Sequence, residues 1–202
     1  MGIVTADISV TLDGYAAGPN QRLEKPFGDF DEERVHAWMF QHVEDHKPER
    51  DAIVQAGAYI MGRNMFTPGR GDWDPDWRGY WGDDPPYHAP VFVLTHHERE
   101  PVPMDGGTTF HFVTDGAESA MALAREAAGD RDVSIAGGAE TLNQYLALGE
   151  VDELRLHVVP FTAGDAGSRV FAGVPAIDLE VARVRHTPHV THMTLRPGRS
   201  DG

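Results

Sequence analysis

A pair of glycines between a predicted strand and a predicted helix is the first feature of this chain that could do chemistry. Residues 133–135 are apolar enough for a buried strand, Gly137 and Gly138 follow, and a helix is expected over residues 141–148. Glycine lets a ligand approach the backbone closely, and free N–H groups at the start of a helix attract anions. The pattern is typical of a phosphate site, although a tight turn without a ligand uses the same residues.

Further polar groups follow two other predicted strands. Gly62 and Arg63 come directly after a strand at 58–61, and Thr95 and His96 end a strand at 90–95. A guanidinium can hold a phosphate through two parallel hydrogen bonds, but in so acidic a chain it could equally pair with a carboxylate. Ligands of open α/β sheets bind at the carboxyl ends of strands, so these groups are expected to converge with the glycine turn.

Composition limits the function. The chain has 202 residues, a formal net charge of −15 and no cysteine. Negative charge of this size disfavours nucleic acid and anionic membranes as partners, and the missing thiols exclude disulfides and cysteine nucleophiles. No targeting leader or long apolar run is visible, so we expect a cytoplasmic protein. Redox chemistry would need a bound cofactor, and without a Gly-x-Gly-x-x-Gly fingerprint a Rossmann dehydrogenase is disfavoured.

The histidines do not form a recognisable metal motif. Eleven are scattered along the sequence. His42 and His46 are four residues apart on one face of a predicted helix, but no third ligand is placed beside them. We expect them to be solvated and predict no metal site; a histidine-based metal enzyme remains the weakest hypothesis.

The elements that must position these groups follow from periodicity. β-branched and alternating stretches predict strands, and apolar spacings of three and four predict helices. Strands that first alternate with helices and later follow one another indicate an α/β fold with a mixed sheet whose parallel part comes first. The expected strands are 3–10, 58–61, 90–95, 109–113, 133–135, 153–159, 179–185 and 191–195, and the expected helices are 31–44, 49–57, 116–128 and 141–148.

The segment 67–90 is long, irregular and rich in aromatic residues. It contains Trp73, Trp77, Tyr80, Trp81 and Tyr87 among many glycines and prolines. Long loops in compact domains are often functional, and clustered aromatic side chains usually cover something. A lid over a pocket, a contact with a second subunit and a packed surface excursion are all open.

Several motifs occur in the order and rough spacing of a known family. They lie at residues 9–17, 59–63, 91–96, 135–141, 149–160 and 164–171. Together they resemble the dihydrofolate reductase-like superfamily, in particular the branch related to the reductase half of the bifunctional riboflavin-biosynthesis deaminase/reductase. The resemblance implies one domain over residues 1–195, with a disordered tail at 196–202. Its fold would be a three-layer sandwich: a mixed, mostly parallel sheet, helices on both faces and an antiparallel C-terminal hairpin.

The same resemblance implies NADPH as cofactor. Carried over residue by residue, the end that binds the adenosine 2′-phosphate would comprise Gly62, Arg63, Thr95 and His96. The pyrophosphate set would comprise Gly137, Gly138, Ala139, Glu140 and Thr141. We therefore expect an NADPH-dependent reductase that transfers a hydride to a small heterocyclic or carbonyl substrate. A non-catalytic nucleotide-binding or regulatory module is the alternative, and a homodimer is expected.

Two departures from the family pattern bear on the substrate. The lysine that riboflavin reductases carry before their Asp-Gly turn is Asp7 here, and the glutamate before their Gly-Gly pair is Ala136. Both departures argue against the phosphorylated pyrimidine substrate. A dedicated folate reductase is disfavoured for another reason: the resemblance implies a carboxylate on the buried face of the first helix, and that face carries apolar residues here. Asp7 becomes the candidate proton donor, unless it pairs with a basic residue, since a buried carboxyl group can hold a proton. His36 and Trp38 are candidates for the pocket wall.

Overall fold

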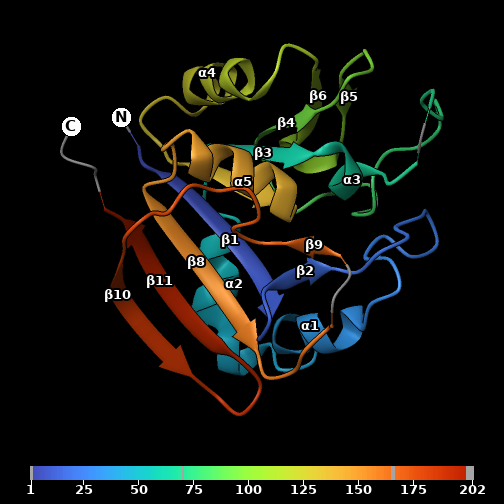
Figure 1. The fold of residues 1–202 in the computed structure, drawn as a ribbon. Helices are drawn as coiled ribbons and strands as arrows, with labels where there is room; N and C mark the ends of the chain where they lie inside the picture. The colour runs from blue at the N-terminus through green and yellow to red at the C-terminus, as the bar shows by residue number, and fades with distance from the viewer. Residues whose placement is uncertain (1, 70, 165–166, 199–202) are drawn as a thin grey trace.

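A mixed sheet forms the centre of the computed structural model, which describes residues 2–69, 71–164 and 167–198 (Figure 1). Within these residues the strand order is β10-β11-β8-β1-β7-β3-β4-β6-β5. The bounds are β1 Val4–Thr11, β3 Ala58–Gly62, β4 Pro90–Leu94, β5 Val102–Pro103, β6 Thr109–Val113, β7 Val133–Gly137, β8 Glu153–Val159, β10 Leu179–His186 and β11 Thr191–Pro197.

The middle of the sheet is parallel and its edges are antiparallel. Strand β1 pairs in parallel with β7 and β8, and β3, β4 and β6 continue the parallel part. The hairpin β10–β11 joins β8 in antiparallel orientation, as does β5 on β6. The predicted mixed sheet with an antiparallel C-terminal hairpin is confirmed. Because β11 runs to Pro197, Arg196 belongs to the strand rather than to the predicted tail, of which residues 199–202 lie outside the described residues.

One face of the sheet is covered by α4 (Ala117–Ala128) and α5 (Ala139–Ala147), of which α5 lies in front of the strands in Figure 1. Alternate residues of β1 point to this face, where Ala6, Ile8 and Val10 join the main apolar cluster. The buried side of α4 includes Ala120 and Ala124, whose small side chains let the helix approach the sheet closely. This alternation leaves the other side chains of β1, among them Asp7, for the opposite face.

The opposite face is covered near β1 and β8 by α1 (Glu32–Phe40), the 3₁₀ turn η1 (Glu44–His46) and α2 (Lys47–Ile53). Val35 and Trp38 of α1 pack there against Val159 and Val190. A single helix over 31–44 was predicted, but the structure divides this stretch. The next helix begins earlier than predicted because Pro48 occupies its first turn, where a proline is favoured.

The aromatic segment 67–90 covers the same face over β3, β4 and β6. In its described part, residues 67–69 and 71–89, it forms no helix or strand. Trp73, Trp77, Trp81 and Tyr87 pack beside the fully buried Tyr59, Met61, Phe66, Val91 and Phe110. The Trp77 Nε1 atom donates a 2.9 Å hydrogen bond to the Phe66 carbonyl. The aromatic side chains of this segment therefore shield this part of the sheet from solvent, as a helix would elsewhere.

A few short elements were not predicted from the sequence. Strand β2 (Tyr15–Ala17) pairs with β9 (Ser168–Arg169) in a separate two-stranded ribbon within the described residues. The short helix α3 (Arg63–Phe66) follows β3 directly, and the 3₁₀ turn η2 (Asp105–Gly107) precedes β6. Among the described residues, no helix is both long enough and apolar enough to span a membrane.

Candidate active site

A cleft with a volume of about 1150 Å³ runs along the carboxyl ends of β3, β4 and β7 and over β1. All three strand-end motifs named from the sequence reach it. The predicted residues that line it are Asp7, His36, Gly62, Arg63, Thr95, His96, Gly137, Gly138, Ala139, Glu140 and Thr141. The parallel arrangement of these strands places their ends at one edge of the sheet, which explains the convergence.

The glycine turn opens helix α5 at the cleft. Gly138 is the N-cap residue, and because glycine has no side chain it makes no cap hydrogen bond to this end of the helix. Gly137 adopts φ of 127°, which glycine tolerates and other residues rarely adopt. Glu140 is exposed in the first turn of α5. Its carboxylate interacts favourably with the positive end of the helix dipole but would repel a bound anion. An anion here would therefore depend on backbone N–H groups.

Gly62 is required by a close approach between β3 and α5. A Cβ atom built on Gly62 would overlap with the hydroxyl oxygen of Thr141. Thr141 is buried on the first turn of α5. The absence of a side chain at position 62 thus brings the end of β3, and with it Arg63, against the glycine turn.

Arg63 lies on the cleft wall, stacked on the aromatic segment. Its guanidinium carbon is 4.2 Å from the ring centroid of Trp73, and its Nη2 atom donates a 2.7 Å hydrogen bond to the Gly71 carbonyl. These contacts hold a planar group with several N–H donors at the mouth of the cleft. Nearby, the hydroxyl of Thr95 accepts a 3.1 Å hydrogen bond from the backbone N–H of His97, while the side chain of His96 is exposed.

Asp7 lines the cleft from the middle of β1 and is buried. Its side chain is 5% exposed, and its Oδ2 atom is 3.4 Å from Arg155 Nη1 on β8. Its Oδ1 atom is 3.6 Å from Nε2 of His157, also on β8, and in the described structure neither of these two atoms has a hydrogen-bond partner. Asp7 thus has a basic neighbour, as one of the sequence hypotheses allowed, and also a second titratable group beside it.

His157 is the cleft residue that the sequence reasoning missed. It is 2% exposed, lies diagonally across from Asp7 in the parallel pair β1–β8, and lines the cleft. The signal was available: Asp7 and Ser9 on one predicted strand, and Arg155 and His157 on another, are polar residues two positions apart. Such residues share a face of a buried strand, but their pairing depends on strand order, which no local pattern reveals.

The two predicted wall residues lie differently. His36 lines the cleft between Phe27 and Phe40, with its Nδ1 atom 3.1 Å from the Glu32 carbonyl. Burial lowers its pKa to about 4. Trp38 does not line the cleft, because its fully buried ring packs on His157 behind the wall and its Nε1 atom donates a 3.0 Å hydrogen bond to Ser9 Oγ.

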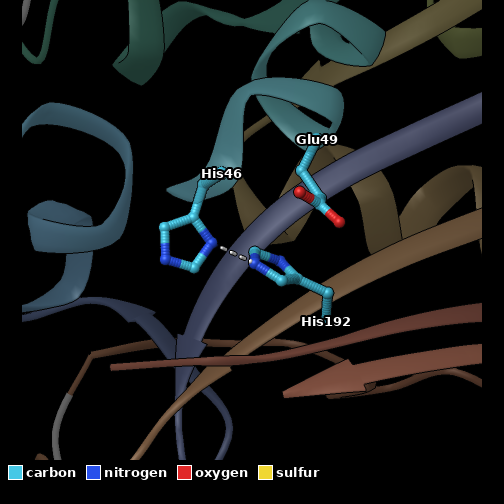
Figure 2. A group of neighbouring side chains, drawn as sticks. All are labelled: His46, Glu49 and His192. Atoms are coloured by element: carbon cyan, nitrogen blue, oxygen red, sulfur yellow. Dashed lines mark hydrogen bonds between the residues drawn. The ribbon is translucent and has the colours of Figure 1, made fainter. Parts of the chain in front are cut away.

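A cluster of side chains lies behind this wall, between η1, α2 and β11 (Figure 2). His46 Nδ1 is 2.8 Å from His192 Nε2, and the Glu49 carboxylate lies beside them. The expectation that His46 is solvated is wrong: it is fully buried, because the chain turns inward at η1 instead of continuing α1. Its predicted partner His42 stacks instead on His189, with ring centroids 3.6 Å apart.

Burial sets the charge of this cluster. It lowers the pKa of His192 to about 3, with further lowering from the neighbouring His157. Burial and the charge of Arg185 lower the pKa of His46 as well. Burial alone would raise the pKa of Glu49, but hydrogen bonds from Arg185 and from the backbone, together with neighbouring charges, outweigh it and the pKa is lowered. The two histidines are therefore neutral and Glu49 is ionised near neutral pH.

Comparisons with solved structures agree with this architecture. A chain described as a riboflavin biosynthesis protein from Shewanella sp. PV-4 has a TM-score of 0.67 and 22% identity, over 98% of this chain and 99% of that chain. The riboflavin biosynthesis reductase of Saccharomyces cerevisiae has a TM-score of 0.55 and 14% identity, over 98% of this chain and 89% of that chain. At such identities the likeness shows the fold alone.

A longer protein shares the fold over part of its length. The diaminohydroxyphosphoribosylaminopyrimidine deaminase/5-amino-6-(5-phosphoribosylamino)uracil reductase of Thermotoga maritima has a TM-score of 0.57 and 16% identity, over 98% of this chain but 57% of that chain. No curated protein matches the sequence. The family model of the RibD C-terminal domain matches residues 3–193, nearly the whole chain. The resemblance noted from the sequence is thereby confirmed, and this chain belongs to the RibD C-terminal domain family.

Proposed function

We propose that this protein is an NADPH-dependent reductase that transfers a hydride to a C=N or C=O bond of a small heterocyclic or carbonyl substrate. The observation that carries the proposal is one cleft that both the phosphate-binding candidates and the buried Asp7 line. Its volume of about 1150 Å³ is slightly above the usual range of ligand pockets, which suits a dinucleotide together with a small substrate. The family supports a reductase role.

The residues present fit a dinucleotide phosphate. The amino end of α5 offers backbone N–H groups that its N-cap residue, a glycine, does not cap, and such helix ends bind anions. A Cβ on Gly138 would meet no described atom within 4 Å apart from its chain neighbours, so the surface beside this turn is open to a ligand. Arg63 adds the positive charge that an extra 2′-phosphate would require in an acidic protein.

When bound, the nicotinamide cofactor would supply the hydride. The chain's own residues would do the rest. The backbone at the glycine turn and Arg63 would anchor the phosphates, and Tyr80, Trp81 and Tyr87 of the aromatic segment would exclude water from the cleft they line. The buried Asp7 would take part in protonating the heteroatom of the reduced bond.

Cofactor titration tests the proposal. We expect NADPH to bind the wild-type protein near stoichiometrically and more tightly than NADH. Arg63→Ala should weaken NADPH about tenfold or more, the scale of a lost charge-assisted hydrogen bond, and leave NADH almost unchanged. Arg22→Ala is the matched control, because Arg22 pairs with Asp29 on the surface and does not line the cleft. Equal affinity for both cofactors, or no binding at millimolar NADPH, would contradict the proposal.

The alternative is a nucleotide-binding module without catalysis. Oxidation of NADPH in the presence of dihydrofolate, pteridines and quinonoid carbonyls separates the two. Turnover that is lost in Asp7→Asn while NADPH still binds supports the reductase. Tight NADPH binding without turnover on any of these classes supports the module.

A further inference from the structure

A row of buried titratable groups leads from the cleft into the protein. His157 Nε2 faces Asp7 Oδ1 at 3.6 Å, and on its other side His157 Nδ1 is 2.8 Å from His192 Nδ1. His192 Nε2 is 2.8 Å from His46 Nδ1, which in turn lies 3.1 Å from Arg185 Nη2. The chain of contacts thus connects an arginine on β10 to a carboxylate in the cleft.

Arg185 determines where the ring protons of the inner histidines lie. A guanidinium only donates hydrogen bonds, so His46 Nδ1 must accept and can carry no proton of its own. His192 Nε2 lies against the same nitrogen at 2.8 Å and must donate, because two lone pairs at that distance repel. Nε2 of His46 has no hydrogen-bond partner in the described structure in either tautomer, so it does not alter this choice.

The position of the His192 ring proton in turn determines the tautomer of His157. A neutral His192 with its proton on Nε2 has an unprotonated Nδ1. This atom lies 2.8 Å from His157 Nδ1, which must therefore be the donor. A neutral His157 ring therefore carries its one proton on Nδ1, in the hydrogen bond to His192. The Nε2 atom of His157 would then face the cleft without a proton.

That arrangement leaves two acceptors facing each other. An unprotonated His157 Nε2 and an ionised Asp7 Oδ1 would lie 3.6 Å apart in a buried position, without hydrogen-bond partners in the described part of the chain. One added proton removes this conflict, since it converts the pair into an imidazolium and a carboxylate. Arg155, 3.4 Å from Asp7 Oδ2, favours the carboxylate form and so leaves the proton on His157.

The charged groups around His157 come from every element packed against it. They are Asp7 on β1, Arg155 on β8, His192 on β11, His36 on α1, His46 on η1, Glu49 on α2 and Arg185 on β10. The carboxylates of Asp7 and Glu49 favour a cation, and the arginines oppose it. Asp7 is the carboxylate that faces His157 Nε2, at 3.6 Å, and the inner histidines are kept neutral by burial.

A metal ion is a weaker interpretation of the same cluster. The donor atoms of His46, Glu49 and His192 lie within 4.8 Å of one another, a spacing that can hold a cation. Arg185 already donates to Glu49 Oε2 at 2.6 Å and to His46 Nδ1, so a positive charge occupies this position and the nitrogen lone pair is engaged. We therefore assign these residues to the hydrogen-bonded chain (Figure 2).

We propose that His157, paired with Asp7, holds the proton that the cleft delivers to its substrate, and that Arg185 acts through His46 and His192 as a positioning residue that fixes the His157 tautomer. The inference rests on the proposed reductase function. In the step, the carbon of the C=N or C=O bond gains the hydride and the reduced cofactor becomes its oxidised form. The heteroatom takes the Nε2 proton, neutral His157 remains beside the Asp7 carboxylate, and solvent restores the proton.

Nitrogen NMR of the intact, ligand-free protein labelled with ¹⁵N-histidine tests this directly. Long-range correlations between ring carbon-bound protons and ring nitrogens report which nitrogens carry protons. Near neutral pH we expect both nitrogens of His157 to be protonated, and His192 and His46 to be neutral with their protons on Nε2. An unprotonated His157 Nε2, or a His192 proton on Nδ1, would overturn the proposal, and neither result needs a variant.

Variants separate the two parts of the proposal. In Asp7→Asn, His157 should lose its Nε2 proton near neutral pH; an unchanged His157 cation would refute the pairing. In Arg185→Met, the His192 signals should move toward a mixture of both tautomers, whereas Arg183→Met, an exposed neighbour on β10, should leave them in place. Unchanged His192 signals in Arg185→Met would refute the positioning role. Because no cofactor is present, failure of NADPH binding and failure of this inference are distinct results.

Discussion

The guanidinium of Arg63 lies over the indole ring of Trp73, with 4.2 Å between the guanidinium carbon and the ring centroid. This contact links the aromatic segment to the part of the cleft proposed to bind phosphate. Trp73 also packs on Phe112 of β6 and donates a 3.0 Å hydrogen bond to the His97 carbonyl. The ring is thus fixed on three sides and can hold the arginine in one orientation.

Trp73→Leu should therefore weaken NADPH binding without removing the charge. A cation–π contact of this kind contributes about 0.5–1 kcal/mol, and the freed arginine loses its orientation as well. We expect the dissociation constant for NADPH to rise about threefold to tenfold. Trp73→Phe, which keeps an aromatic face, is the control in the same titration, and an equal loss in both variants would argue against stacking as the cause.

Gly62→Ala should disturb the junction of β3 and α5, because the added methyl group would overlap the Thr141 hydroxyl. Overpacking of this kind costs about 1–3 kcal/mol of unfolding free energy. Removal of the obstructing group in the double variant Gly62→Ala/Thr141→Ala should restore part of that loss. Urea unfolding of the two single variants and the double variant measures the coupling, and strictly additive effects would show that the overlap is relieved elsewhere.

Stability should fall as the solution is acidified. The pKa of His192 drops from the ordinary 6.5 to about 3 on folding, and that of His36 to about 4, so the unfolded chain binds more protons in the range between. The contribution is fully present above about pH 6.5 and is lost progressively toward these lower values. Urea unfolding at about pH 7 and about pH 5 should differ by one to a few kcal/mol. His192→Gln should show a shallower dependence; an equal slope would rule out this histidine as a source.

Glu49 and Arg185 should be coupled more strongly than a surface pair. Their contact is 2.6 Å with side chains 11% and 30% exposed, whereas Lys47–Asp51 on the same helix is 64% and 46% exposed. A double-mutant cycle should give about 1–3 kcal/mol for the first pair and below about 0.5 kcal/mol for the second. Added salt should reduce only the surface value. Comparable coupling energies in the two cycles would contradict the predicted effect of burial.

Much of the fold was predictable because its signals are local. The strands at 109–113 and 153–159 have the predicted bounds, and the apolar pattern of each is continuous or alternating. The short strands β2 and β9 were missed, since elements of two or three residues carry no periodicity. The early end of α1 at Phe40 and the separate turn η1 were also missed, because the acidic and apolar residues from 31 to 44 fit one helix equally well.

The site residues that directly follow a strand could be predicted from the sequence. Those that come together only through the pairing of two strands were harder to predict. Gly137, Arg63 and Thr95 each follow a visible strand, and the parallel topology brings them together. Asp7 and His157 meet only through the register of β1 with β8, which local pattern cannot supply. Trp38 lies on the buried face of its helix, as predicted. Its hydrogen bond to Ser9, however, places it behind the cleft wall and not in it.

Strand β1 takes its sheet partners from distant parts of the chain. The hydrogen bond from Ile3 to Asp132 spans 129 residues, and that from Arg155 to Asp7 spans 148. Folds dominated by such separations have high contact order and close slowly. During synthesis, β1 would stay without its sheet partners until β7 and β8 have been made, so chaperone dependence and aggregation should be concentrated in this strand.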